Sequence, residues 1–129
     1  MIAVMLSTSR AVRVLVVDDD VVLLRSLTRA MERAGWLVTD AESGEAGLQA
    51  LERSTFDVIV ADFQMPGVDG RTVLAAARCS SPNSVRVIMT AADVDPAYAF
   101  AQRLAAKPIG PAELCELVEA ALVGGTMRE

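Results

Sequence analysis

The chain has 129 residues, which suits one globular domain and is short for two. Its hydrophobic fraction of 53% excludes a disordered chain, and no apolar run approaches the roughly 20 residues that a membrane-spanning helix needs. The net charge of −5 disfavours nucleic-acid binding, and the absence of histidine excludes histidine-based catalysis and the commonest zinc ligand.

The first part of the chain alternates predicted strands with predicted helices. Residues 12–17 form a continuous aliphatic run, typical of a strand buried on both faces of a parallel sheet. The following segment carries apolar residues at helical spacing: Leu24, Leu27, Met31 and Ala34. Gly35 fits the C-terminal cap of this helix, and a short strand is expected over 36–41. A second helix is expected over 44–53, capped by Ser43.

The alternation continues to the end of the chain. Strands are expected at 56–61, 85–89 and 104–106, and helices at 70–78, from about 95, and at 111–122. The last helix should turn five apolar residues inward: Leu114, Leu117, Val118, Ala121 and Leu122. Five strands alternating with five helices imply parallel strands joined by right-handed crossovers.

These elements predict an α/β fold with a flavodoxin-like, doubly wound, five-stranded parallel sheet in the order 2-1-3-4-5. The domain is expected over residues 12–123, after a leader of residues 1–11 and before a tail of residues 124–129. As the end of the chain after the last helix, this tail is expected to fray.

Polar residues follow four of the five predicted strands: Asp18 and Asp19, Asp62, Thr90, and Lys107. The carboxyl ends of parallel strands lie at one edge of a sheet, so we expect these side chains to meet there. Three neighbouring carboxylates repel one another, and a hard cation with oxygen ligands, Mg²⁺ above all, relieves that repulsion. Lys107, the only lysine of the chain, could pair with the acids and later hold a phosphoryl oxygen.

Each of these residues also has an ordinary structural interpretation. The acids at 18–20 could cap a helix, Asp69-Gly70 could form a turn, and Thr90 could be a strand-end hydroxyl. Lys107-Pro108 could simply lead into a helix. Taken singly, each structural interpretation is favoured, but their joint placement at strand ends favours a functional site.

Four segments, at 14–20, 57–70, 87–91 and 107–108, resemble the CheY-like receiver domains of two-component response regulators. The central motif is an apolar strand followed by D-x-x-M-P-x-x-D-G, which starts at Asp62. The resemblance extends from about residue 13 to about residue 122. It implies a phosphoprotein of a phosphorelay that acts in signal transduction and is not a conventional enzyme.

The resemblance assigns roles to individual residues. Asp62 would be the phosphoacceptor, Thr90 would hydrogen-bond the phosphoryl group, and Lys107 would neutralise its charge. The implied Mg²⁺ site has four contributors: Asp19, Asp62 and the Gln64 backbone carbonyl directly, and Asp18 through a bound water. Because a carboxylate is a weak nucleophile, the catalysis would come from neutralising the charge of the phosphoryl oxygens and from positioning the reacting groups.

Partners and location follow from the same resemblance and from composition. The donor would be a sensor histidine kinase, a phosphotransfer protein or acetyl phosphate, and the output partner is unknown. We expect a monomer or weak homodimer that binds neither nucleic acid nor membranes. Cys79 and Cys115 form no CxxC pair, and residues 1–6 make a poor signal peptide, so we expect reduced thiols and a cytoplasmic protein.

The sequence departs from the family's pattern near its end. Leu104 stands where members usually carry an aromatic residue, Ala101-Gln102 replaces a Gly-Ala pair, and Ile109 replaces a phenylalanine. Only 17 positions separate Thr90 from Lys107, about one helical turn fewer than the family pattern. We therefore expect a short fourth helix and a switch carried mainly by the loop at 90–95, with Leu104 staying packed.

Two other functions stay open. A receiver-like interaction module could bind its partner without phosphorylation, which the altered fourth-helix region favours. An Asp-nucleophile phosphatase would need a second acid two residues after Asp62, where this chain has Gln64. Flavin binding is disfavoured, because the acids at 18–20 would repel a phosphate.

Overall fold

The computed structural model describes residues 11–127, so most of the predicted leader and the end of the predicted tail lie outside the described residues. Its five strands form one parallel sheet in the order β2-β1-β3-β4-β5, which confirms the predicted fold. The strands are β1 (Arg13–Val17), β2 (Leu37–Ala41), β3 (Val58–Asp62), β4 (Val85–Thr90) and β5 (Arg103–Ala106). The helices are α2 (Val21–Arg33), α3 (Gly44–Arg53), α4 (Gly70–Ser80), the 3₁₀ helix η1 (Pro96–Ala99) and α5 (Pro111–Met127).

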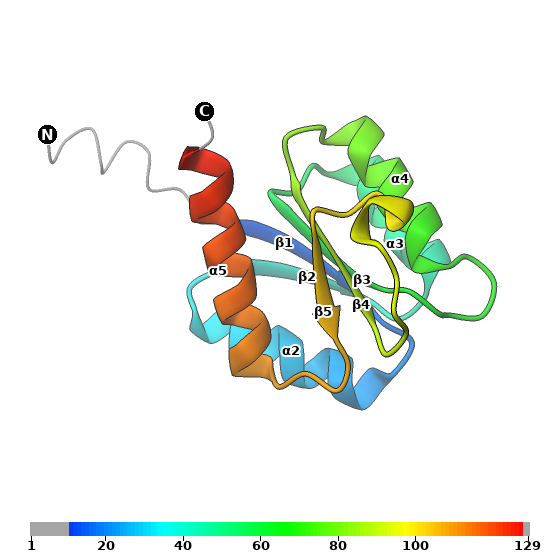
Figure 1. Ribbon diagram of the computed structural model, residues 1–129, viewed down its shortest axis with the longest axis horizontal. Helices are drawn as coiled ribbons and strands as arrows, with labels where there is room; N and C mark the ends of the chain where they lie inside the picture. Colours follow the sequence, from blue (N-terminus) through cyan, green and yellow to red (C-terminus); the bar gives the residue numbers. More distant parts are fainter. Residues whose placement is uncertain (1–10, 128–129) are drawn as a thin grey trace, which may run out of the picture.

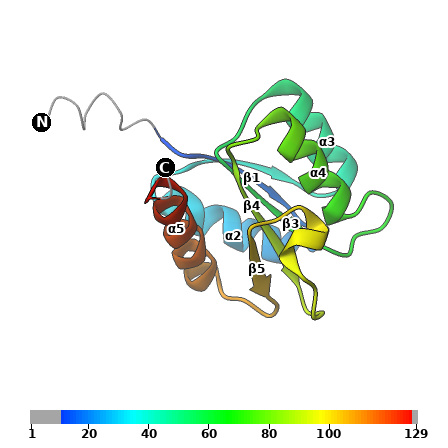
Figure 2. The ribbon, with the colours of Figure 1, turned by 45° about the horizontal axis from the view of Figure 1, so that its top comes forward.

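Helices cover both faces of the sheet (Figures 1 and 2). On one face, alternate strand residues such as Leu15 and Ile59 pack against α3 and α4. On the other face, their strand neighbours Val14 and Val58 pack against α2 and α5. Because successive side chains of a strand point to opposite faces, each central strand contributes to both cores. This double burial explains why β1 and β3 are apolar throughout and why polar residues begin only where they end.

Polar caps fix where the helices begin. Asp20, Ser43 and Asp69 each accept a hydrogen bond from a backbone N–H of the first turn of α2, α3 and α4, respectively. Gly35 follows α2 with a φ of +95°, a conformation that favours glycine. The predicted capping roles of Ser43 and Gly35 are therefore confirmed.

Two local predictions are wrong. Ala34 is exposed, because α2 already ends at Arg33. The helix expected to end at residue 122 runs to Met127, since an α-helix tolerates glycine at a cost of only about 1 kcal/mol per residue. Between β4 and β5 the described chain has no α-helix but the single 3₁₀ turn η1, which confirms the short helix expected from about residue 95.

Arg86, a buried residue of β4, holds this short connection between β4 and β5. Its side chain donates to the carbonyl oxygens of Phe100 at 2.7 Å and Ser84 at 3.1 Å. The side chain of Gln102 accepts a hydrogen bond from the Arg86 backbone N–H at 2.6 Å. Phe100 itself has a φ of 61°, in the left-handed region that reverses the chain after η1. The buried guanidinium thus satisfies backbone carbonyls on both sides of β4, one just before the strand and one just after η1.

No helix within residues 11–127 combines the length and the apolar character that crossing a membrane requires.

Candidate functional site

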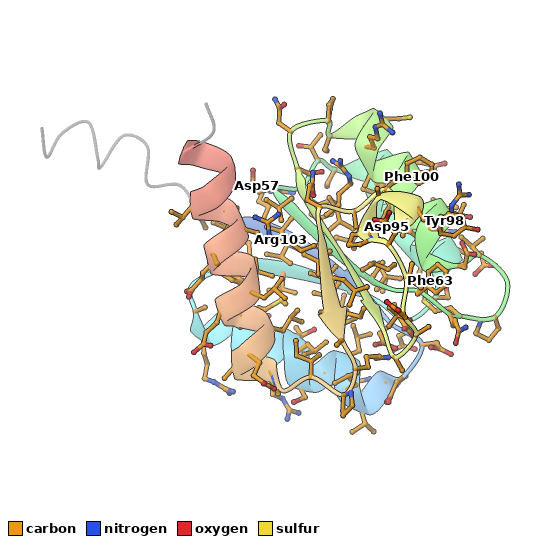
Figure 3. All side chains as sticks on the ribbon, in the orientation of Figure 1. Asp57, Phe63, Asp95, Tyr98, Phe100 and Arg103 are labelled. Carbon is orange, nitrogen blue, oxygen red and sulfur yellow. The ribbon has the colours of Figure 1, made fainter. Side chains whose placement is uncertain are left out.

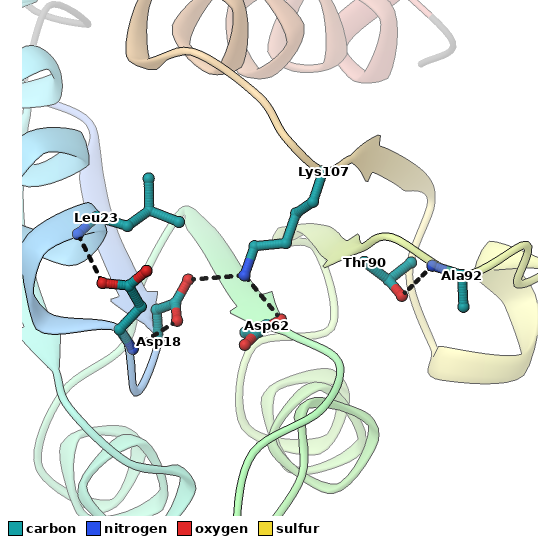
Figure 4. Close-up of polar contacts among 7 residues, drawn as sticks. Asp18, Leu23, Asp62, Thr90, Ala92 and Lys107 are labelled. Carbon is teal, nitrogen blue, oxygen red and sulfur yellow. Dashed lines mark hydrogen bonds and ion pairs between the residues drawn. The ribbon is translucent and has the colours of Figure 1, made fainter.

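The ends of β1, β3 and β5 bring two acids and one amine together (Figure 4). Nζ of Lys107 lies 3.2 Å from Oδ1 of Asp62 and 3.4 Å from Oδ2 of Asp18. The Asp18 side chain is fully buried and that of Asp62 is 10% exposed, whereas that of Lys107 is 23% exposed. The predicted convergence of these strand-end residues is therefore confirmed.

Asp19 completes a group of three carboxylates with Asp18 and Asp62. One ligand oxygen from each of the three lies within 4.8 Å of the others, and Asp19 is exposed to solvent. Three carboxylate oxygens so close together are the donors that a hard divalent cation prefers, and the exposed side gives an ion access. The donor set therefore fits Mg²⁺ and does not fit a metal that needs nitrogen or sulfur ligands.

Burial and charge shift the titration of the site. Burial, followed by the charge of Asp18, raises the pKa of Asp62 to about 6, although Lys107 partly opposes this. Burial alone would lower the pKa of Lys107, but the charges of Asp18 and Asp62 outweigh it and raise that pKa. Lys107 therefore stays charged, and the Asp62 carboxylate is destabilised compared with an ordinary aspartate.

Backbone contacts hold the two buried acids in place. Oδ1 of Asp18 accepts a hydrogen bond from the Asp20 N–H at 2.9 Å, which leaves Oδ2 directed to Lys107. A side chain at Gly70, the first residue of α4, would overlap the backbone carbonyl of Asp62. Glycine there lets the start of α4 pack directly on the end of β3. The D-x-x-M-P-x-x-D-G motif is thus also a packing motif, in which Asp69 caps the helix that Gly70 begins.

Thr90 and Gln64 lie beside this group. Thr90 is buried, and its Oγ1 accepts a hydrogen bond from the Ala92 N–H at 3.0 Å (Figure 4). The hydroxyl hydrogen of Thr90 is still available for another acceptor. Gln64 is exposed in the loop after β3, two residues past Asp62. The roles assigned to the Thr90 hydroxyl and the Gln64 carbonyl remain predictions.

A comparison with models of protein families identifies the family of this chain. The model of the response regulator receiver domain matches residues 14–119. The chain belongs to this receiver domain family. Receiver domains are in general signalling modules of two-component systems, which bind Mg²⁺ at acidic residues and interact with histidine kinases and output domains.

Relatives and solved structures agree with this assignment. The transcriptional regulator NtrC of Escherichia coli (strain K12) is 39% identical over 112 residues, which cover 83% of this receiver domain and 24% of that protein. The chain therefore spans about a quarter of the length of this relative. A CheY-like receiver domain from Methanospirillum hungatei has a TM-score of 0.84 and 25% identity, covering 93% of this chain and 100% of that one. Chemotaxis regulator CheY4 of Vibrio cholerae, at 23% identity, a TM-score of 0.80 and coverages of 87% and 99%, supports the fold alone.

The helix-capping role that the sequence left open for the acids at 18–20 belongs to Asp20, whose side-chain oxygen accepts from the Leu23 N–H and which is not part of the carboxylate group. One feature of this receiver domain was not predicted from the sequence. Arg86 forms the buried contacts described above. An arginine inside the apolar run at 85–89 was the available signal for such a role, because a buried charge needs hydrogen-bond partners.

Proposed function

We propose that Asp62 accepts a phosphoryl group in a Mg²⁺-dependent transfer and that the receiver domain then binds a partner through an altered surface. The observation that carries this proposal is the position of Lys107, 3.2 Å from Asp62 and 3.4 Å from Asp18. A charged amine beside a buried acid is suited to receive additional negative charge at Asp62.

Asp18, Asp19 and Asp62 would hold the Mg²⁺, with Gln64 adding its backbone carbonyl. The proximity of the three carboxylates supports this assignment. The exposed Asp19 is suited to direct binding, and Asp18, engaged by Asp20 and Lys107, to contact through water. When bound, the ion would neutralise phosphoryl oxygens in the transition state and lower the repulsion among the acids.

The chain's own residues supply the remaining chemistry. An oxygen of Asp62 attacks phosphorus, and the phosphorus–nitrogen bond of a phosphohistidine, or the phosphorus–oxygen bond of acetyl phosphate, breaks. The bonding electrons leave with the imidazole or the acetate. With a pKa of about 6, Asp62 is mostly ionised at neutral pH and can act as this nucleophile. Lys107 then binds a phosphoryl oxygen, and the Thr90 hydroxyl donates its free hydrogen to another.

The wider role is proposed on the same basis. The phosphoryl donor would be a histidine kinase or a phosphotransfer protein, and the chain would act as a cytoplasmic signalling domain, not as an enzyme that turns over a substrate. We propose the receiver boundaries at residues 12–123, with a monomer or weak homodimer that binds no nucleic acid and no membrane. The net charge of −5 supports the absence of nucleic-acid binding.

A second function is favoured by one observation. The connection between β4 and β5 holds a single 3₁₀ turn, and Leu104 takes the place of the family's aromatic residue. A partner could therefore bind this receiver domain without phosphorylation. A phosphatase reaction is disfavoured, because Gln64 offers no carboxylate to act as its general acid.

An intact-mass measurement separates these functions. After incubation with acetyl phosphate and Mg²⁺, the protein should gain the mass of one phosphoryl group, and chelation of the metal should prevent this. Asp62→Asn should abolish the gain, while Asp40→Asn, which alters an exposed acid of β2, should leave it unchanged. An unmodified wild-type protein under conditions that label another receiver domain would support the phosphorylation-independent module.

A further inference from the structure

Helix α4 and the turn η1 form a surface that carries two arginines and two aromatic residues. We call it the α4–η1 surface and define it by Arg71, Arg78, Tyr98 and Phe100. Figure 3 shows Tyr98 and Phe100 on η1 and the residue after it, against α4. The side chain of Tyr98 is 58% exposed, which is unusual for a large aromatic residue. This surface includes the short fourth helix that the sequence led us to expect.

Arg71 joins the two elements of this surface. Its guanidinium carbon lies 4.6 Å from the ring centroid of Tyr98 and 4.8 Å from that of Phe100. Its Nε donates to the Tyr98 carbonyl oxygen at 2.7 Å. Arg78, seven residues further along α4, lies 5.8 Å from the Phe100 ring. The aromatic rings therefore help to hold both guanidinium groups in place, with Arg71 partly buried and Arg78 exposed.

The positive charge of this region is not balanced. Among residues 11–127, Arg71, Arg78 and the underlying Arg86 have no carboxylate within ion-pair distance. The acids in the same elements, Asp69 and Asp95, accept hydrogen bonds from the helix ends that they cap. The pKa of Arg86 is lowered by burial and then by the charge of Arg78, which agrees with two cations close together without an anion.

From this unbalanced charge we propose that the α4–η1 surface binds an acidic segment of a partner protein. The planar guanidinium can bind a carboxylate through two parallel hydrogen bonds, and an exposed tyrosine adds apolar contact area at little entropic cost. Arginine and tyrosine are also the residues that most often dominate binding at protein interfaces. Nucleic acid fits less well, because two arginines in a chain of net charge −5 neutralise few phosphates.

One contact connects this surface to the phosphoacceptor. Phe63, which directly follows Asp62, meets Tyr98 edge to face, with ring centroids 6.5 Å apart and planes at 67°. The Phe63 N–H also donates to the Met89 carbonyl oxygen, so the backbone that carries this ring is fixed to β4 next to Thr90. We infer that phosphorylation changes the affinity of the surface through this pair, an inference that rests on the proposed function of Asp62.

Fluorescence anisotropy with a labelled synthetic peptide, in which glutamates and leucines alternate at helical spacing, tests the surface. We expect binding that weakens as salt is added, and no binding of a peptide with glutamine in place of glutamate. In NMR spectra, bound peptide should perturb the amide resonances of α4 and η1. Arg78→Glu should weaken binding roughly fivefold or more. The matched control is Arg29→Glu, the same charge reversal at an exposed residue of α2, which should change peptide affinity far less. Equal losses in both variants, or resonance shifts confined to other elements, would overturn the proposal.

Two further measurements complete the test. Binding of a DNA duplex at least as tight as that of the peptide would assign the surface to nucleic acid instead. Self-association that is detected by sedimentation and abolished by Arg78→Glu would assign it to a second copy of the chain.

The coupling to phosphorylation is tested by comparing peptide affinity with and without acetyl phosphate, in wild type and in Tyr98→Leu. Intact mass shows whether the protein carries a phosphoryl group, and its loss in Asp62→Asn assigns that group to Asp62. A modified protein with unchanged affinity contradicts the coupling alone, whereas an unmodified protein contradicts the proposed function. Peptide binding to the unmodified protein tests the surface in either case.

Discussion

Nζ of Lys107 lies 3.2 Å from Oδ1 of Asp62, although the two residues are 45 positions apart along the chain. The same amine reaches Asp18, so one side chain links the ends of three strands. In the absence of metal, Lys107 supplies the positive charge that lets two buried acids lie side by side. Lys107 and a metal ion would therefore neutralise the same carboxylates.

Replacement of Lys107 by alanine should leave Mg²⁺ affinity unchanged or slightly higher, because a cation that competes for Asp18 and Asp62 is removed. Isothermal titration calorimetry at neutral pH measures this affinity. Arg25→Ala, which removes an exposed partner of Glu42, serves as the control and should have no effect. A folded Lys107→Ala protein that no longer binds Mg²⁺ would show that the amine organises the metal site.

The metal-free protein should become less stable as the pH rises from about 4 to about 7. The folded-state pKa of Asp62, about 6, exceeds its ordinary value of 3.8, so the folded state binds the proton more tightly than the unfolded state. The stabilisation from this proton is complete below pH 4 and is lost as the pH passes 6. Two pKa units correspond to at most about 3 kcal/mol.

Urea unfolding of wild type and Asp62→Asn, in chelator, measures this effect. The stability advantage of the asparagine variant should grow from pH 4 to pH 7, and added Mg²⁺ should reduce it by stabilising the wild type. Asp40→Asn should show no such growth. A pH-independent difference between wild type and Asp62→Asn would mean that the buried carboxylate has an ordinary pKa.

Gly70→Ala should destabilise the fold by roughly 2 kcal/mol or more, because the new methyl group would overlap the Asp62 carbonyl and press on Ile88. Thermal or urea unfolding gives the value. In Gly124→Ala the added methyl meets only the end of the Arg103 side chain, and within α5 this change should be neutral or stabilising. Equal stability of the two variants would argue against tight packing of α4 on β3.

Activation should move the loop at 90–95 while Leu104 stays packed. Oγ1 of Thr90 accepts from the Ala92 N–H, so any displacement of Thr90 toward a phosphoryl group pulls on this loop. Leu104 packs at the edge of the core shared with α3 and α4 and has no hydroxyl or ring to reorient. Amide and methyl chemical shifts with and without beryllofluoride report both regions. Large shifts at Leu104 with an unchanged loop would show that leucine replaces the family's aromatic residue as the moving part.

The sheet and the acidic site could be predicted from the sequence because both depend on local signals. Apolar runs such as 12–17 mark buried strands, and the polar residue after each run has its position fixed by the parallel topology. The hydrogen bonds of Arg86 and the contact of Phe63 with Tyr98 could not be predicted in this way. They join segments whose relative position depends on the path of the chain between β4 and β5, and no periodic pattern encodes that path.

Lys107 is the only lysine of the 129 residues, and its amine is occupied by two carboxylates. A reagent that acylates primary amines can therefore modify side chains of this protein at one position only, apart from the chain terminus. Since reaction requires the neutral amine, the raised pKa should make acylation slow, and any event that withdraws Asp18 or Asp62 from the amine should accelerate it. The rate of amine labelling is thus a built-in chemical reporter of the charge state of the site, and it needs no engineered probe.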